Sequence, residues 1–198
     1  MYKRDELDRF YTPDALATAC IEALAAEEGP ITRAFEPSVG GGAFVKALAA
    51  AGCKRRGGCD VDPDADGFNY LSQHKHTGRP GFVCDFLELT PEHIAASMGG
   101  SCTGVIGNPP YRDAEAHLRH ALDVSDRHVA FLLRSSFLAS QKRSRDLWAW
   151  APLRKVWVIS PRPSFTGDGR TDGSEYSLIW LDKLHHTPAT LGWLSEWR

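Results

Sequence analysis

Short apolar runs rich in β-branched and aromatic residues alternate along the chain with stretches of helical periodicity. Such alternation is typical of a parallel sheet that is covered by helices on both faces. The runs that we interpret as strands in the first two thirds of the chain lie near 33–35, 57–59, 82–84, 105–106 and 129–133.

Capping residues indicate where the intervening helices begin and end. A threonine or aspartate followed by proline suits the N-cap and N1 positions of a helix, which predicts helix starts at Thr12-Pro13 and at Asp62-Pro63. The first of these helices is expected to run to Gly29. A further helix over 43–48 is expected to end near Gly52, a C′ glycine.

The last third of the chain has a different pattern. Two apolar runs, 156–159 and 176–181, are joined by a loop rich in proline and glycine that has no helical periodicity. A helix-free connection between neighbouring strands requires an antiparallel pair. We therefore predict an α/β fold with a doubly wound, mostly parallel seven-stranded sheet and one antiparallel strand near the C-terminus.

Length and composition indicate how many domains the chain can form and which kinds of protein it can be. With 198 residues, of which 42% are hydrophobic, the chain suffices for a single domain over 1–198 but not for two well-formed ones. We find no apolar run of membrane-spanning length and no signal peptide. The five cysteines never form a Cys-x-x-Cys pair and the histidines form no zinc-like pattern, so we predict reduced thiols, a cytoplasmic protein and no metal.

The net charge of −2 does not by itself suggest a polyanionic partner, but the charge is unevenly distributed. Between Arg134 and Arg170, eight basic residues stand against Asp146 and Asp168. This asymmetry is typical of a nucleic-acid contact, although a solvated basic face is the alternative interpretation.

The tetrapeptide Asn108-Pro109-Pro110-Tyr111 is the strongest chemical signal. It follows the apolar run 104–106, so it is expected to leave the end of a buried strand. Two prolines make this backbone rigid and poor in donors, which leaves carbonyl acceptors, one amide and an aromatic face. Such a set suits the gripping of an exocyclic amine on a flat ring, with the Asn108 oxygen and the Pro109 carbonyl as acceptors and Tyr111 stacked on the ring. An ordinary turn after a strand is the alternative.

A glycine loop, Glu36-Pro37-Ser38-Val39-Gly40-Gly41-Gly42, follows the first predicted strand. Glycines let the backbone approach a ligand at the carboxyl end of a strand. The loop matches neither Gly-x-Gly-x-x-Gly nor a Walker loop, and its leading acid favours a cationic ligand such as a sulfonium amino acid. Asp60 follows the next strand, where a carboxylate would bind a ribose diol or, alternatively, cap a helix.

These segments together resemble the class I S-adenosylmethionine-dependent methyltransferases. More narrowly, they resemble the amino-methyltransferases of the N6-adenine DNA type in which the cofactor motifs precede the catalytic one. The resemblance extends from Phe10 to about Asp182. The matching segments, in the order of the family, are Phe10-Tyr11-Thr12-Pro13, the glycine loop 36–42, Asp60, Asp85-Phe86 and the tetrapeptide 108–111.

The resemblance implies S-adenosylmethionine as the cofactor. Its methionine moiety would be held by Glu36, Pro37, Gly40 and Gly42, with Tyr11, Thr12 and Pro13 beside it. Its nucleoside would be held by Asp60 at the ribose, Val61 against adenine, and Asp85 and Phe86 at the adenine amine. For Asp85-Phe86, an ordinary strand end with a core phenylalanine is the alternative.

A base inside a duplex cannot reach the tetrapeptide loop, so the target base must be flipped out or already single-stranded. The resemblance places a second stacking aromatic in the long loop between the last two strands, where Phe165 stands; a ring folded onto the core is the alternative. The basic residues that we assign to nucleic-acid contacts are Arg162, Arg170, Lys142 and Arg143.

The sequence thus predicts methyl transfer to the N6 amine of adenine in DNA. RNA adenine and a protein glutamine amide are alternative acceptors, and a non-catalytic module that binds cofactor or DNA is the alternative of another class. No separate target-recognition domain is expected, and the oligomeric state is left open.

Overall fold

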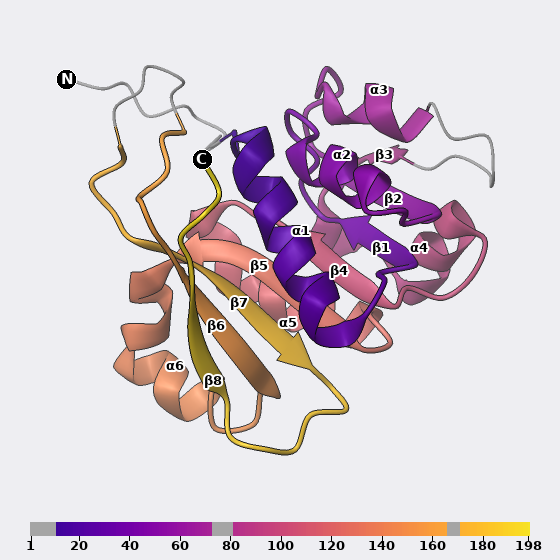
Figure 1. Ribbon diagram of the computed structural model, residues 1–198. Helices are drawn as coiled ribbons and strands as arrows, with labels where there is room; N and C mark the ends of the chain where they lie inside the picture. The colour runs from indigo at the N-terminus through magenta and orange to yellow at the C-terminus, as the bar shows by residue number, and fades with distance from the viewer. Residues whose placement is uncertain (1–10, 73–80, 166–170) are drawn as a thin grey trace.

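The computed structural model describes residues 11–72, 81–165 and 171–198, and these contain an eight-stranded sheet with helices on both of its faces (Figure 1). The strand order is β3-β2-β1-β4-β5-β7-β6-β8. The strands are β1 Arg33–Glu36, β2 Arg55–Asp60, β3 Gly81–Val83, β4 Gly104–Gly107, β5 His128–Arg134, β6 Leu153–Ile159, β7 Tyr176–Asp182 and β8 Thr190–Leu194. The helices are α1 Asp14–Glu28, α2 Ala43–Ala50, α3 Gly67–Ser72, α4 Pro91–Met98, α5 Ala114–Val124 and α6 Gln141–Asp146, with short 3-10 helices η1 Phe86–Glu88, η2 Tyr111–Asp113 and η3 Ser135–Ala139.

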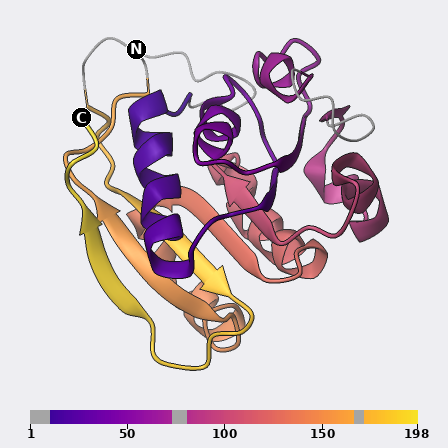
Figure 2. The same ribbon diagram turned by 45° about the vertical axis from the view of Figure 1, so that its right-hand side comes forward.

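The pairing of the strands confirms the predicted doubly wound, mostly parallel sheet. Strands β3, β2, β1, β4 and β5 are parallel to one another, whereas β7 is antiparallel to both of its neighbours, β5 and β6 (Figure 2). The predicted strand number of seven was wrong, because β8 adds a parallel edge strand beside β6. Gly192 weakens the strand signal of β8; a Cβ there would lie 3.2 Å from the Trp157 ring, which is a close contact.

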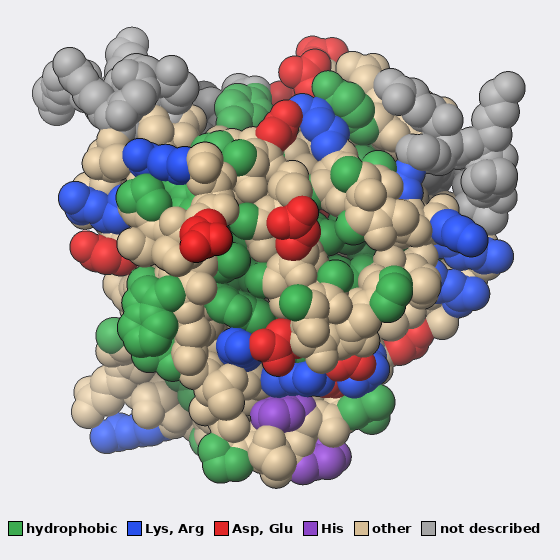
Figure 3. Space-filling view, in the orientation of Figure 1, with side chains coloured by type: hydrophobic (Ala, Val, Ile, Leu, Met, Phe, Trp, Pro, Cys, Tyr) green, Lys and Arg blue, Asp and Glu red, His purple; other side chains and the backbone are tan. Residues whose placement is uncertain are grey.

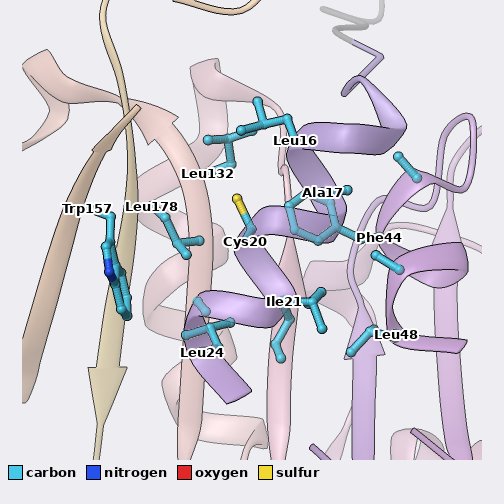
Figure 4. Close-up of a cluster of buried hydrophobic side chains, with 14 of the residues drawn as sticks. Leu16, Ala17, Cys20, Ile21, Leu24, Phe44, Leu48, Leu132, Trp157 and Leu178 are labelled. Carbon is cyan, nitrogen blue, oxygen red and sulfur yellow. The ribbon is translucent and has the colours of Figure 1, made fainter. Parts of the chain in front are cut away.

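Alternation along the central strands divides the core into two layers. In β5, Ala130 and Leu132 face the layer that contains α1 and α2, while Val129 and Phe131 face the layer that contains α4 and α5. In Figure 4, the apolar side chains of α1 point toward the sheet and toward α2. Leu16, Cys20 and Leu24 are among those that point toward the sheet. Each face of the sheet is therefore buried, as a doubly wound fold requires.

Two predicted helix starts were wrong in detail. Helix α1 begins at Asp14 with Pro13 at the N-cap, so Thr12 precedes the helix and does not cap it. Helix α3 begins only at Gly67, because the Asp62 carboxylate accepts the backbone N–H of Asp64 at 3.0 Å and forms a turn instead. The predicted end of α2 is confirmed, since Gly52 follows the C-cap with φ of +79°.

No described helix combines the length and the apolar character needed to cross a bilayer.

Candidate active site

One pocket lies at the carboxyl ends of four adjacent parallel strands. The loops that follow β1, β2, β3 and β4 line it, which is where ligands bind in open α/β sheets. Among the residues predicted from the sequence, the pocket brings together Tyr11, Pro37, Gly40, Asp60, Val61, Asp85, Phe86, Asn108, Pro109, Pro110 and Tyr111.

Asp60 ties the glycine loop to the loop after β2. Its Oδ2 accepts the backbone N–H of Gly40 at 2.8 Å, and its Oδ1 accepts that of Asp62 at 3.0 Å. It caps no helix, so the capping interpretation of Asp60 is wrong. Gly67 makes the close approach of α3 possible, because a Cβ there would lie 2.8 Å from the Val39 carbonyl oxygen. The floor of the pocket is therefore built around a carboxylate and a close-packed glycine loop.

Asp85 and Phe86 have structural roles as well as places in the pocket. The Asp85 carboxylate accepts the backbone N–H of Leu87 at 2.9 Å and caps η1. The Phe86 side chain is buried and stacks on Phe35 and on His117. A ligand in the pocket can therefore meet Phe86 through its backbone but not through its ring.

Glu36 does not line the pocket. Its side chain is 3% exposed, and Oε2 has no hydrogen-bond partner among the described residues. Burial raises the pKa of this carboxyl well above its usual value; a backbone hydrogen bond from Val45 opposes that shift and the charge of Asp60 adds to it. Gly42 also lies outside the lining, at the N-cap of α2 with φ of +80°, and a Cβ there would lie 2.7 Å from Tyr70.

The tetrapeptide Asn108-Pro109-Pro110-Tyr111 is anchored to the segment that precedes α1. The Asn108 Nδ2 donates to the Thr12 hydroxyl at 3.0 Å, which joins positions 96 residues apart. Neither Thr12 nor Pro13 lines the pocket. Thr12 is therefore a hydrogen-bond partner of Asn108, whereas the resemblance implied a position beside the methionine moiety.

The Tyr111 ring forms one wall of the pocket and is supported from behind. The Arg134 guanidinium lies over the ring, 5.2 Å from its centroid, and the Tyr176 ring lies 5.6 Å away at an interplanar angle of 45°. Burial raises the pKa of the Tyr111 hydroxyl well above its usual value, and the neighbouring Tyr176 adds to this. Tyr111 is therefore held as a neutral, fixed aromatic surface.

Phe165, the predicted second stacking ring, lies in the core. Its side chain is 8% exposed and packs edge-on against Tyr176 at 4.8 Å. The folded-back interpretation describes this position, and the stacking assignment of Phe165 is wrong for the structure as it stands. The ring followed the general tendency of apolar aromatics to be buried.

The basic segment is partly structural. Arg154 pairs with Glu28 and Asp182, and Lys155 pairs with Glu27, so these charges connect β6 to α1 and β7. Arg162 donates weakly to the Gly173 carbonyl, and Lys142 is exposed on α6. Arg170 lies outside the described residues. Figure 3 shows Lys and Arg side chains interspersed with Asp and Glu on the face that it presents.

Several lining residues were not predicted from the sequence, among them Cys84 and His117. A hydrogen bond with Cys59 lowers the pKa of the Cys84 thiol, and burial lowers the pKa of His117. Cys84 directly follows β3, so its position after a strand was the available signal. His117 lies on α5 and carried no such signal.

No group of three His, Cys, Asp or Glu residues suited to a metal occurs in the part of the chain that the structure describes.

Comparison with known proteins gives a match by structure alone. No family model matches the chain, and no curated protein matches its sequence. A Pyrococcus horikoshii protein described as a "putative RNA methyltransferase" superposes with a TM-score of 0.69 at 15% identity, over 91% of this chain and 90% of that one.

Two further solved structures have similar scores. A Listeria monocytogenes protein described as a "putative class I S-adenosylmethionine-dependent methyltransferase" has a TM-score of 0.70 at 12% identity, over 98% of this chain and 68% of that one. A modification subunit of a "putative type I restriction enzyme" from Vibrio vulnificus has a TM-score of 0.68 at 14% identity, over 96% of this chain and 48% of that one. At these identities the comparison shows that the chain has the Rossmann-like fold that these proteins share.

Proposed function

We propose that the protein is an S-adenosylmethionine-dependent methyltransferase that acts on the N6 amine of adenine in DNA, on a base that is flipped out or single-stranded. The observation that carries this proposal is the shared pocket. Asp60, Asp85 and the glycine loop line it together with Asn108, Pro109 and Tyr111. A cofactor-binding set and an amine-binding set therefore open into one space.

The lining fits the proposed cofactor. The cofactor, when bound, supplies a methyl group on a positively charged sulfur. The pocket is lined by four carboxylates, of Asp60, Asp62, Asp85 and Asp113, and by Arg112, so acids outnumber bases in a way that suits a cation and hydroxyl or amine donors. Gly40 and Gly41 approach the Tyr11 ring so closely that a Cβ on Gly41 would lie 3.2 Å from it. Asp60 is proposed to bind the ribose hydroxyls and Val61 to pack on the cofactor's adenine.

The tetrapeptide is proposed to hold the acceptor amine. The amine's lone pair is delocalised into the ring, and acceptors for both of its hydrogens draw the nitrogen toward tetrahedral geometry. The Asn108 Nδ2 donates to the Thr12 hydroxyl, so the acceptor role is assigned to the Asn108 oxygen, which is buried in the structure. The Pro109 carbonyl is the second acceptor and Tyr111 the stacking surface. The methylated nitrogen loses its extra proton to water, so a general base is unnecessary.

RNA adenine is the second candidate acceptor. The similarity to the Pyrococcus horikoshii protein described as a "putative RNA methyltransferase" favours it, whereas the similarity to the Vibrio vulnificus modification subunit favours DNA. The tetrapeptide would serve either polymer, because the 2′-hydroxyl lies away from the exocyclic amine.

Mass spectrometry of nucleosides tests the proposal directly. Unmethylated DNA and RNA are incubated with S-adenosylmethionine and either the parent protein or Asn108→Ala. N6-methyldeoxyadenosine that appears only with the parent protein is the expected result, and N6-methyladenosine alone would move the substrate to RNA. No methylated nucleoside in either polymer, with cofactor still bound, would instead support a protein amide acceptor or a binding module.

A further inference from the structure

A second pocket adjoins the first at Tyr111 and Arg112. It is bounded by the end of β5, η3, the first turn of α5 and the start of α6. Tyr111 and Arg112 line both pockets, so the two spaces share a wall. The proposed methyl transfer to the amine uses only the first pocket.

The second pocket carries a positive charge. Arg112, Arg134 and Arg143 line it, against the single carboxylate of Glu115. That carboxylate is already engaged, at 2.9 Å by Arg119 and at 3.8 Å by Arg143. Three guanidinium groups around one neutralised acid suit an oxyanion, because each guanidinium offers a planar set of donors.

Two of the three arginines, Arg143 and Arg134, are held against aromatic rings before any ligand arrives. The Arg143 Nε donates to the Phe137 carbonyl at 2.8 Å, and its guanidinium lies over the Phe137 ring, 4.3 Å from the centroid. Arg134 lies over Tyr111 in the same way. Arg112 has a side chain that is 75% exposed and pairs with Asp113, so it can turn toward either pocket. Arginines fixed against aromatic rings lose little side-chain entropy when they bind an anion.

We propose that this second pocket binds a phosphodiester group of the polynucleotide next to the target nucleotide. The inference rests on the proposed function, since it assumes that the target base lies against Tyr111. A base on one side of that ring brings its own sugar-phosphate backbone to the rim that Arg112 shares between the pockets. The phosphate contacts thereby set the register of the strand, and Tyr111 separates the base from its backbone.

Oligonucleotide binding as a function of salt tests the site through Arg143→Gln and Arg112→Gln. Each variant should lose one phosphate contact, which lowers the slope of log affinity against log salt by about 0.7 for a single strand. At 0.1 M salt, that slope corresponds to an affinity about fivefold lower. Arg145→Gln is the matched control. This substitution removes the same charge, but Arg145 is exposed on α6 and does not line the pocket. Equal losses in all three variants would overturn the site.

Inorganic phosphate provides a probe that does not depend on methyl transfer. We expect a saturable shift of the Arg143 Nε–Hε resonance in the parent protein and in Arg145→Gln, and a weaker shift in Arg112→Gln; the absence of a shift in the parent would overturn the anion site. If phosphate binds but oligonucleotides do not, the polynucleotide ligand is wrong, and with it the proposed substrate. Thermal unfolding of each variant identifies any loss of folding, and Arg143→Lys, which keeps the charge, should recover most of the salt slope.

Discussion

The hydrogen bond between Asn108 and Thr12 is the contact whose removal tests the site most directly. It joins the tetrapeptide 108–111 to Thr12, two residues before α1, at 3.0 Å and across 96 positions of sequence. Thr12→Val keeps the shape of the side chain and removes the acceptor. Asn108→Ala removes the donor, and the double variant removes both.

The expected magnitudes follow from the partly buried, neutral character of this bond. A hydrogen bond of this kind contributes about 1 kcal/mol net, whereas a donor left buried without its acceptor costs about 1–3 kcal/mol. Thr12→Val should therefore lower the free energy of unfolding by about 1–3 kcal/mol. The same change in the Asn108→Ala background should cost less, with a coupling energy of about 1 kcal/mol between the two positions.

Urea denaturation of the four proteins measures that coupling, and transfer assays on the same samples measure its consequence. With the Asn108 amide no longer oriented, methyl transfer by Thr12→Val should fall about fivefold, as 1 kcal/mol implies, while cofactor affinity changes less than about twofold. Additive unfolding energies would refute the hydrogen bond. A loss of cofactor affinity with unchanged transfer would refute the role of Thr12 and return it to the cofactor side.

Three further predictions concern separate parts of the molecule. Asp60→Asn should weaken cofactor binding about 10- to 100-fold by calorimetry, because it removes charge-assisted bonds of about 1.5–3 kcal/mol; an unchanged affinity would contradict the assigned role. Burial raises the pKa of Asp182, but hydrogen bonds from Arg127 and Arg154 outweigh it and lower that pKa to about 2. The carboxylate therefore contributes stability above pH 4, and about 2 kcal/mol of it should be lost as the pH falls toward 2. Urea titrations should show a flatter profile of unfolding free energy against pH in Asp182→Asn, and identical profiles would disprove the linkage. Phe165→Ala should lower the free energy of unfolding by about 3–5 kcal/mol, and weaker base binding with unchanged stability would instead return this ring to the substrate site.

The sequence predicted the sheet and most of the pocket because both depend on local signals combined with one topological rule. Polar or glycine-rich segments that directly follow apolar strands identify Gly40, Asp60 and Asn108. Once the strands are parallel, their carboxyl ends share one edge, so these residues come together without any knowledge of side-chain packing.

The failures share a different cause, since each depended on long-range packing. Phe165 is buried against Tyr176, and β8 forms by pairing with β6, a partner distant in the sequence. Thr12 fits the local pattern of a helix cap, but its hydroxyl instead accepts a hydrogen bond from Asn108, 96 residues away in the sequence. Propensity and capping patterns carry no information on such partners.

The position of Phe165 also changes how the proposed substrate must be held. With Phe165 in the core, Tyr111 is the one ring still assigned to stack on a base, and Arg134 and Tyr176 already pack against it. Stacking on one face recovers about 1–3 kcal/mol, which does no more than offset the few kcal/mol needed to unstack a base. The remaining affinity must then come from the backbone, where the arginines of the second pocket lie. On the proposed function, we therefore expect substrate binding to depend mainly on phosphate contacts and to fall steeply with salt.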